Sequence, residues 1–285
     1  ECDLLIAVGC RFSDRVALKP DTFASQARIV HIDIDRSEID KNVLTDHHII
    51  GSARRVLELL NQRLPQYHHQ AWRDRILPLR EPSIPRVSES LTPKQVLETI
   101  RRIAPWDSIV ATDVGQHQMW SIQHFHFDYP GQLLTSGGFG TMGFGLGAAI
   151  GAKVGNPDKV VIHTTGDGCF RMNCHELATV QYYHLPIITV VFNNGTLGMV
   201  RQWQHLIYHE HYSQTTLDRG PDFVKLAEAY GLKGKRVTNQ GEMEEALKEA
   251  LSCGCGYVID CQIDMDEMVR PMVPAGAHIT DFLLK

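Results

Sequence analysis

The sequence lacks any apolar run that approaches the roughly 18 residues needed to cross a bilayer, so we expect no membrane span and no membrane partner. It also lacks a strong charge imbalance, because 28 lysines and arginines face 33 aspartates and glutamates and leave a formal net charge of −5. Together with a pI near 6.3, this balance argues against a nucleic-acid binder. We find no internal repeat or low-complexity tract, and we expect no signal peptide.

The even, closely spaced cysteines of a disulfide framework are also absent. The seven cysteines, at positions 2, 10, 169, 174, 253, 255 and 261, are odd in number and scattered, which predicts reduced thiols. We therefore expect a cytoplasmic location of the bacterial type, or the stroma or matrix of an organelle in a eukaryote. Cys253-Gly254-Cys255 could bind a metal, but no second pair lies at ligand spacing, so a turn before a strand is the favoured interpretation.

A lead-in before the first strand is missing as well. Glu1 is not a methionine, and the pattern of residues 4–8 already predicts a buried strand. A domain rarely begins in this way, so we expect a truncated or processed chain that lacks N-terminal segments. The 285 residues, of which 43% are hydrophobic, still suffice for one large or two modest domains with a buried core.

Residues 1–64 alternate between strand and helix. Strands are predicted at 4–8 and 29–34 and a helix at 53–64, an alternation that is typical of a parallel sheet. The next stretch, residues 65–92, contains four prolines and many charges, and we interpret it as a connector with a short helix around Trp72.

From Thr92, a predicted N-cap before Pro93, the pattern becomes regular. We expect residues 93–285 to form one doubly wound α/β domain with a parallel sheet of about six strands. The predicted strands are 108–113, 159–164, 186–192, 235–238 and 257–263. The predicted helices are 93–104, 116–124, 143–154, 174–183, 222–230 and 242–251.

Unusual residues follow three of these strands. One strand leads into Asp113-Val114-Gly115, the next into Gly166-Asp167-Gly168, and a third into Asn193-Asn194. Ligands of doubly wound sheets bind at the carboxyl ends of the strands, so these residues are expected to converge. The side chains of Asp167 and Asn194 and the main-chain carbonyl of Thr196 are oxygen donors suited to Mg²⁺.

The glycines beside Asp167 would let the backbone approach a diphosphate that Mg²⁺ neutralises. Gly-Asp-Gly or Asn-Asn-Gly alone is more often an ordinary turn. Their joint occurrence after adjacent apolar strands favours a cofactor site.

The pattern from Gly166-Asp167-Gly168 to Asn193-Asn194 matches the diphosphate signature of thiamine-diphosphate enzymes. Within that superfamily, several strings resemble the catalytic subunit of acetolactate synthase (acetohydroxyacid synthase). These strings are Val8–Arg15, His31–Asp35, Val114–Trp120, Ser136–Gly145 and Leu197–Gln204. The resemblance covers essentially the whole chain and implies a partial flavin-binding domain at 1–64, a linker at 65–92 and a thiamine-diphosphate domain at 93–285.

The resemblance also implies roles for individual residues. Met142 would support the bent form of thiamine diphosphate, and Asp167, Asn194 and Thr196 would ligate Mg²⁺. The residues implied in cofactor binding are Val114, Gly115, Gln116, His117, Gly140, Met142, Gly166, Asp167, Gly168, Cys169, Asn194, Thr196, Leu197, Gly198 and Met199. FAD would lie against Arg11, Ser13, Asp14, Arg15, Asp33 and Ile34, although Ser13 stands where the family usually has an acidic residue.

The implied reaction is the decarboxylation of pyruvate and its condensation with a second 2-keto acid to 2-acetolactate or 2-aceto-2-hydroxybutyrate, as in branched-chain amino-acid biosynthesis. Trp203 would shape the pocket for the second substrate, 2-ketobutyrate or pyruvate, although a plain core tryptophan is the alternative. The implied assembly is a homodimer or tetramer, with a small regulatory subunit as a further partner. No catalytic acid or base is assigned to this chain, because the family's activating glutamate belongs to an N-terminal domain outside these residues.

Two alternatives stay open. The chain could act as a related decarboxylase or carboligase, for example on glyoxylate or oxalyl thioesters. It could also be an inactive fragment that only binds the cofactor.

Overall fold

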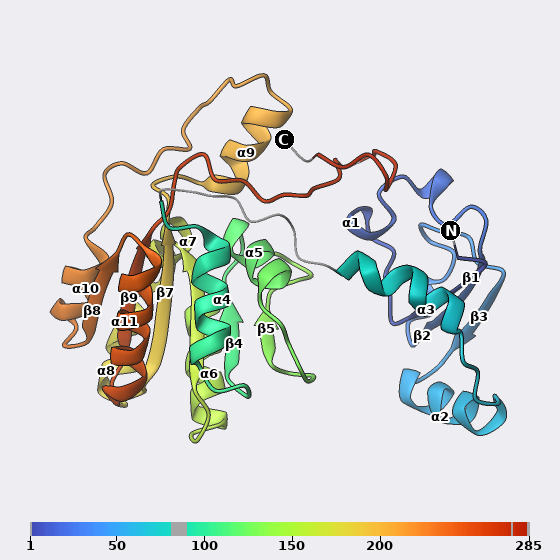
Figure 1. Cartoon of the computed structure of the whole chain (residues 1–285), viewed down its shortest axis with the longest axis horizontal. Coiled ribbons are helices and arrows are strands. Elements are labelled where there is room, and N and C mark those ends of the chain that lie inside the picture. Colours follow the sequence, from blue (N-terminus) through green and yellow to red (C-terminus); the bar gives the residue numbers. More distant parts are fainter. Residues whose placement is uncertain (1, 81–89, 275, 284–285) are drawn as a thin grey trace. The chain divides into compact units, whose positions relative to one another are not determined.

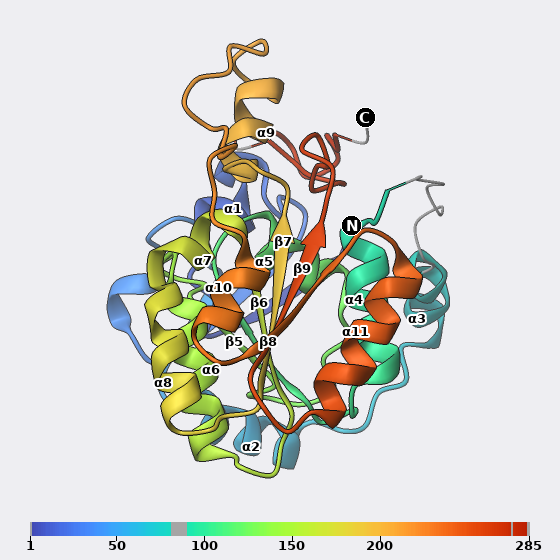
Figure 2. The ribbon, with the colours of Figure 1, turned by 90° about the vertical axis from the view of Figure 1, so that its left-hand side faces the viewer.

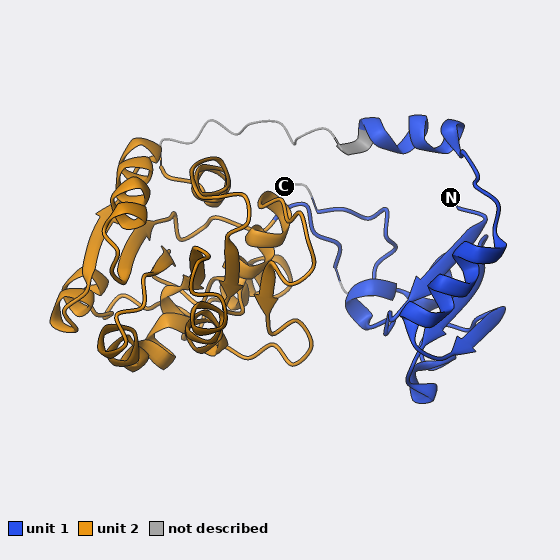
Figure 3. Ribbon diagram, turned by 90° about the horizontal axis from the view of Figure 1, so that it is seen from below, with its two compact units in different colours: residues 1–85, 270–285 blue, residues 86–269 orange. Residues whose placement is uncertain are grey.

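A computed structural model describes residues 2–80, 90–274 and 276–283. Internal contacts divide the chain into two compact units, residues 1–85 with 270–285 (unit 1) and residues 86–269 (unit 2), coloured separately in Figure 3. Residues 270–285, which the sequence pattern assigns to the second predicted domain, group with unit 1 by their contacts. Part of the predicted connector, residues 81–89, lies outside the described residues.

Unit 1 contains a three-stranded parallel sheet in the order β1-β2-β3 (Figure 1). Its strands are β1 (Leu4–Val8), β2 (Arg28–Asp33) and β3 (His47–Ile50), of which β3 was not predicted. Its helices are α1 (Asp14–Ala17), α2 (Ala53–Arg63) and α3 (Gln70–Ile76), with short 3₁₀ turns at Pro20–Thr22, Arg36–Glu38 and Leu77–Arg80. The helix predicted around Trp72 is α3.

The prediction that β1 is buried was wrong. Leu4, Ile6 and Val8 are 49, 50 and 38% exposed, and within the strand only Ala7 is buried. Side chains alternate between the two faces of a strand, and Leu5 and Ala7 point into the small core of this unit. A continuous apolar run predicts a strand covered on both faces, but only one face of β1 is covered by described residues of the unit.

Unit 2 is built on a six-stranded, all-parallel sheet in the order β5-β4-β6-β7-β9-β8, as predicted for a doubly wound α/β fold. Its strands are β4 (Ile109–Thr112), β5 (Leu133–Thr135), β6 (Val161–Gly166), β7 (Ile187–Asn193), β8 (Lys233–Val237) and β9 (Tyr257–Gln262). The sequence predicted about six strands but did not locate β5. This edge strand has only three residues, too few for an apolar pattern to stand out.

Helices cover both faces of this sheet (Figure 2). α4 (Pro93–Ile103) and α11 (Gln240–Ser252) lie on one face, and α6 (Phe144–Gly155), α8 (Leu177–Tyr182) and α10 (Phe223–Ala229) lie on the other. The remaining helices are α5 (Gln116–His124), α7 (Asp167–Asn173), the 3₁₀ turn Cys174–Glu176 and α9 (Gly198–Leu206). Across the residues described, no helix combines the length and the apolar character that crossing a membrane requires.

Local sequence signals account for the start of α4. Thr92 Oγ1 accepts a hydrogen bond from the Gln95 amide at 3.3 Å, and Gln95 Oε1 accepts one from the Thr92 amide at 2.9 Å. This capping box confirms the predicted N-cap. Val96, Leu97 and Ile100 then pack fully buried in the larger core cluster of unit 2.

Chain order and sheet order together fix the place of the site. From β4 the chain runs outward to β5 at one edge, then crosses back to β6 and β7 on the other side of β4. The strand order therefore reverses between β4 and β6, which is where doubly wound sheets bind ligands. The carboxyl ends of β4, β6 and β7 carry Asp113, Asp167 and Asn194, respectively.

Candidate functional site

A cavity with an empty volume of about 520 Å³, part of it open to solvent, lies at the carboxyl ends of these strands. The residues that line it are 114–117, Trp120, Met142, 166–169, Phe192, Asn194 and 196–200. The cavity thus collects fourteen of the fifteen residues predicted to bind the cofactor, all except Gly140.

Asp167 is the first residue of α7 and is 2% exposed. Its Oδ2 atom is buried and has no hydrogen-bond partner among the residues that the structure describes. Burial raises the pKa of Asp167 to about 6, although the charge of Arg171 and the amide of Gly168 act in the opposite direction. A buried carboxylate oxygen without a partner is costly, so this position is suited to a cation that would neutralise it.

Asn194 and Thr196 follow β7 and are held by a polar network. Asn194 Nδ2 donates to Gln116 Oε1 at 3.2 Å, and Asn194 Oδ1 accepts from the Thr196 amide at 3.3 Å. Thr196 Oγ1 donates to the carbonyl of Thr215 at 2.9 Å. The network fixes the loop after β7, and Gly195 permits the turn because its φ is +65°.

This set of donors is suited to Mg²⁺, which prefers oxygen ligands and retains water and phosphate oxygens among them. It offers one carboxylate, one amide oxygen and one main-chain carbonyl. Within the described ranges, no group of three or more His, Cys, Asp or Glu side chains is placed to hold a metal. A cation here would thus complete its coordination with groups other than acidic side chains, for example the oxygens of a diphosphate.

His117 lies in the cavity wall at the start of α5 and is 4% exposed. Its Nε2 atom is buried, and no described residue provides it with a hydrogen-bond partner. Burial lowers the pKa of His117 to about 4 even though the charge of Asp113 opposes the shift, so the ring is neutral near pH 7. Two glycines make room for it, since a Cβ at Gly166 or at Gly115 would lie 2.9 Å from an atom of the ring.

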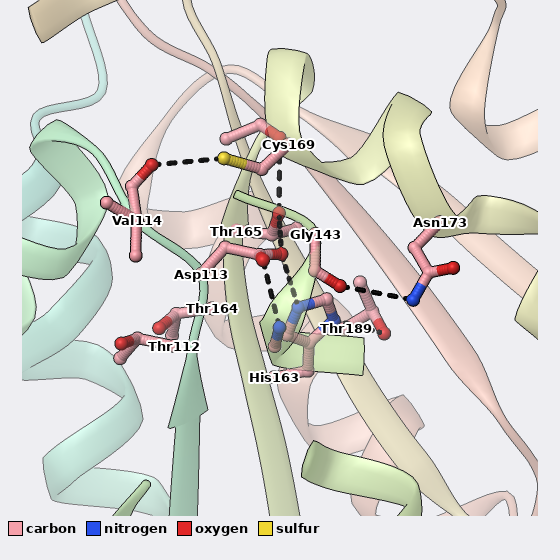
Figure 4. Close-up of polar contacts among 12 residues, drawn as sticks. Thr112, Asp113, Val114, Gly143, His163, Thr164, Thr165, Cys169, Asn173 and Thr189 are labelled. Carbon is pink, nitrogen blue, oxygen red and sulfur yellow. Dashed lines mark hydrogen bonds and ion pairs between the residues drawn. The ribbon is translucent and has the colours of Figure 1, made fainter. Parts of the chain in front are cut away.

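Beneath the cavity, a buried polar cluster joins β4, β6 and α6 (Figure 4). Asp113 Oδ2 lies 3.0 Å from His163 Nε2 and accepts from Thr165 Oγ1 at 2.7 Å, and Asp113 Oδ1 accepts from the Gly145 amide at 2.9 Å. Burial alone would raise the pKa of Asp113, but the hydrogen bond and charge of His163, with the bonds from Gly145 and Thr165, lower it to about 2.

Asp113 belongs to the Asp113-Val114-Gly115 motif, but the sequence did not predict it as a site residue. Its carboxylate satisfies an amide in the first turn of α6, a role usually taken by a residue at the N-cap, where this helix has Gly143. The glycine-rich turn that carries Met142 leads directly into that helix. The Gly143 carbonyl is in turn bonded by Asn173 Nδ2 at 3.1 Å.

Two other predicted residues lie outside the lining of the cavity, namely Gly140 and Trp203. Gly140 belongs to the turn before α6 and has φ of +77°. Trp203 is half-buried on α9, one turn beyond the lining residue Val200. The sequence in turn missed Trp120, Phe192 and Val200, apolar wall residues that only the packing of α5, β7 and α9 brings together.

The residues predicted to contact flavin are all in unit 1. Arg11, Ser13, Asp14 and Arg15 follow β1, with Ser13 as the N-cap of α1. Asp33 is the last residue of β2, and Ile34 follows it. β1 and β2 are adjacent and parallel, so both groups lie at the same edge of the sheet. Ile34 is 76% exposed, and Asp33 Oδ1 accepts from the Asp35 amide at 2.8 Å.

Comparison with known proteins agrees with this geometry. Residues 113–261 match the family described as thiamine pyrophosphate enzyme, C-terminal TPP binding domain, and residues 1–60 match the central domain of such enzymes. The chain is 45% identical over 99% of its length to a probable acetolactate synthase large subunit of Methanocaldococcus jannaschii, and 43% identical over its whole length to the acetolactate synthase isozyme 2 large subunit of Escherichia coli. It is also 43% identical over 97% of its length to the acetolactate synthase large subunit of Porphyra purpurea.

The chain spans about half the length of these relatives, 50, 52 and 48% respectively. The match to the C-terminal TPP binding domain covers more than half of the 285 residues and includes the whole wall of the cavity. The chain therefore belongs to the thiamine pyrophosphate (thiamine diphosphate) enzymes.

Proposed function

We propose that this chain is the cofactor-holding part of an acetolactate synthase. The reaction would be the decarboxylation of pyruvate and its condensation with a second 2-keto acid, pyruvate or 2-ketobutyrate, to 2-acetolactate or 2-aceto-2-hydroxybutyrate. The observation that carries the proposal is the buried Oδ2 of Asp167, which has no hydrogen-bond partner among the described residues, in a cavity that Asn194 and Thr196 also line. The names of the relatives support the choice of reaction.

Within this proposal, Asp167, Asn194 and the Thr196 carbonyl would hold Mg²⁺. The backbone of residues 114–116 and the ring of His117 would face the diphosphate, because His117 Nε2 has no hydrogen-bond partner in the described part of the chain. When bound, thiamine diphosphate supplies an electron sink for the carbon that loses CO₂. The chain's own contribution is to bind and orient that group and to support it from the side of Met142.

The walls of the cavity suit a reaction that releases CO₂ from a charged acid. Trp120, Phe192, Leu197, Met199 and Val200 line it with apolar surface. Such walls exclude water, and a 2-keto acid carboxylate that loses its hydration is closer to losing CO₂. Trp203 would act beyond this wall, on the second substrate, as one turn of α9 separates it from Val200.

The proposal includes further groups and partners. FAD would bind at the edge of the unit 1 sheet formed by Arg11, Ser13, Asp14, Arg15, Asp33 and Ile34. The glutamate that activates the cofactor would come from outside residues 1–285, from a neighbouring subunit of a homodimer or tetramer. The relatives are named large subunits, and we extend to this protein a small regulatory subunit as partner.

Two measurements test the proposal. Titration calorimetry of thiamine diphosphate with and without Mg²⁺ should show binding that depends on the cation and is lost in Asp167→Ala. Pyruvate turnover by the chain together with its activating segment should yield acetolactate. Acetaldehyde without acetolactate, or turnover of glyoxylate or an oxalyl thioester instead, would favour a related decarboxylase or carboligase. Binding without turnover in the complete assembly would leave only the binding role.

A further inference from the structure

A pair of cysteine thiols lies in contact at the turn between α11 and β9. Cys255 Sγ and Cys253 Sγ are 3.0 Å apart, and both residues are half-buried beside the exposed Ser252 and Gly254. Because β9 begins at Tyr257, the pair lies at the amino ends of the strands, whereas the cofactor cavity lies at their carboxyl ends. The pair is thus separate from the site described above.

The hydrogen bonds around the pair distinguish the two sulfurs. Cys253 Sγ accepts from the Cys255 amide at 3.4 Å and from the Cys255 thiol at 3.0 Å. The Cys253 thiol also donates to the carbonyls of Ala250 at 3.4 Å and Cys255 at 3.3 Å, and it gives up these two bonds when it ionises to the thiolate, the reactive form of cysteine. Burial, with the neighbouring Cys253, raises the pKa of Cys255 to about 11, so Cys255 keeps its proton near neutral pH.

The turn between the two cysteines can tighten. Gly254 has φ of +65°, and a Cβ built on it would meet no atom of the described residues within 4 Å, so there is open space beside this glycine. A disulfide requires an S–S distance of about 2.05 Å, roughly 1 Å less than the observed separation. Closing that gap needs a change in side-chain torsions and a small adjustment at a glycine.

We propose that Cys253 and Cys255 form a reversible intramolecular disulfide by exchange with small-molecule disulfides. The Cys253 thiolate attacks one sulfur of the small disulfide, forms a mixed disulfide and releases the other half as a thiolate. Cys255 loses its proton to that released thiolate and attacks Cys253 Sγ, which expels the second half. The two cysteines are oxidised, and the small disulfide is reduced to two thiols.

The other interpretation of the pair, a metal site, lacks further ligands. No cluster of three or more His, Cys, Asp or Glu that could hold a metal occurs in the portion of the chain that the structure describes. Cys169 and Cys261 are buried and face other groups, the Val114 carbonyl and Met243 Sδ. The geometry therefore favours disulfide exchange at Cys253 and Cys255 over metal binding.

The test uses the native chain with oxidised glutathione as the small disulfide. After incubation at pH 8, free thiols are alkylated and the peptide that carries both cysteines is analysed by mass spectrometry. We expect that peptide to lose two hydrogens, to carry no glutathione and to escape alkylation. Cys255→Ser should retain glutathione on Cys253, whereas Cys253→Ser should react at least tenfold more slowly at Cys255.

The matched control is Cys174→Ser, which removes another half-buried cysteine and should leave the internal disulfide of residues 253–255 unchanged. Full alkylation of the wild-type peptide after incubation would overturn the proposal. So would stable glutathione on both cysteines without an internal bond. Neither outcome depends on bound thiamine diphosphate, so this test is independent of the proposed function.

Discussion

Asp113 and His163 form a buried polar contact between β4 and β6, with 3.0 Å between Oδ2 and Nε2 and side chains that are 1 and 0% exposed. The same carboxylate holds the first turn of α6 through the Gly145 amide. Asp113 thereby connects the two strands that flank the topological switch point to the helix that follows the Met142 turn. Its neighbours in sequence, residues 114–117, form one wall of the cavity.

Replacing this carboxylate should weaken the fold at neutral pH. The pKa of Asp113 is lowered from 3.8 to about 2 in the folded chain, so ionised Asp113 contributes stability that is present above pH 3.8 and lost as the pH falls towards 2. A shift of this size corresponds to about 2 kcal/mol. We expect Asp113→Asn to lower the free energy of unfolding in urea by about that amount at pH 7, with little change in the difference down to pH 5.

Asp158→Asn, at an exposed aspartate of the same unit, is the matched control and should change the stability by less than about 0.5 kcal/mol. Equal effects of the two substitutions would contradict a special role for Asp113. His163→Gln should also destabilise, and the double variant should lose less than the sum of the single losses because the two side chains interact directly.

Replacing Asp167 should have the opposite effect on the free energy of unfolding. Its pKa is raised from 3.8 to about 6, so the ionised form is disfavoured in the cation-free fold, and this cost is absent below pH 3.8 and complete above pH 6. We expect Asp167→Asn to stabilise the cation-free chain by about 1–3 kcal/mol at pH 7.5 and to have little effect at pH 4. Urea unfolding at the two pH values measures this difference.

The same substitution should abolish the Mg²⁺ dependence of thiamine diphosphate binding. If Asp167→Asn is more stable but no longer binds thiamine diphosphate in a cation-dependent way, the carboxylate of Asp167 serves ligand binding and lowers the stability of the fold. A less stable Asp167→Asn at pH 7.5 would show that the orphaned oxygen has a partner within the fold.

The affinity for the cation should also depend on pH. A proton and a cation compete for the carboxylate of Asp167, so cation-dependent binding of thiamine diphosphate should fall about tenfold per pH unit below pH 6. Calorimetry at pH 5 and pH 7 would measure the change. Asp113 stays ionised over this range because its pKa is about 2, and neutral His117, with a pKa of about 4, contributes no charge.

Residues adjacent in sequence were the predictable part of the site. Gly166-Asp167-Gly168 and Asn193-Asn194 directly follow strands with a clear apolar pattern, and parallel strands place their carboxyl ends at one edge. The structure confirms the predicted parallel sheet and brings residues 166–168 and Asn194 into one cavity. The assignment of individual ligands stays a prediction.

Contacts between residues that are distant in the sequence could not be predicted from such local patterns. Asp113 and His163 lie 50 positions apart, and neither belongs to a spacing pattern that indicates their contact. In the sequence, Trp120 and Phe192 cannot be distinguished from ordinary core residues. Only the packing of α5 on the sheet places them at the cavity. The exposed face of β1 shows the same limit, because an apolar run indicates burial but does not say which segment provides the cover.

Gly198 provides a steric test of the polar network around Asn194. A Cβ at this position would overlap Gln116 Oε1 and lie 2.7 Å from Asn194 Nδ2. Gln116 cannot move away freely, because its Nε2 donates to Gln202 Oε1 at 2.9 Å and to the Glu267 carbonyl at 3.0 Å. We expect Gly198→Ala to cost about 1–3 kcal/mol of stability, because buried polar groups lose partners.

Gly198→Ala should also weaken cation-dependent binding of thiamine diphosphate at least tenfold, because Asn194 is displaced with Gln116. Gly147→Ala is the matched control, since this glycine lies within α6 and a Cβ there would meet nothing within 4 Å. It should stabilise the chain by about 0.5–1 kcal/mol, as alanine favours a helix over glycine, and leave binding unchanged. If Gly198→Ala binds the cofactor as tightly as Gly147→Ala does, the position of Asn194 does not control the cation site.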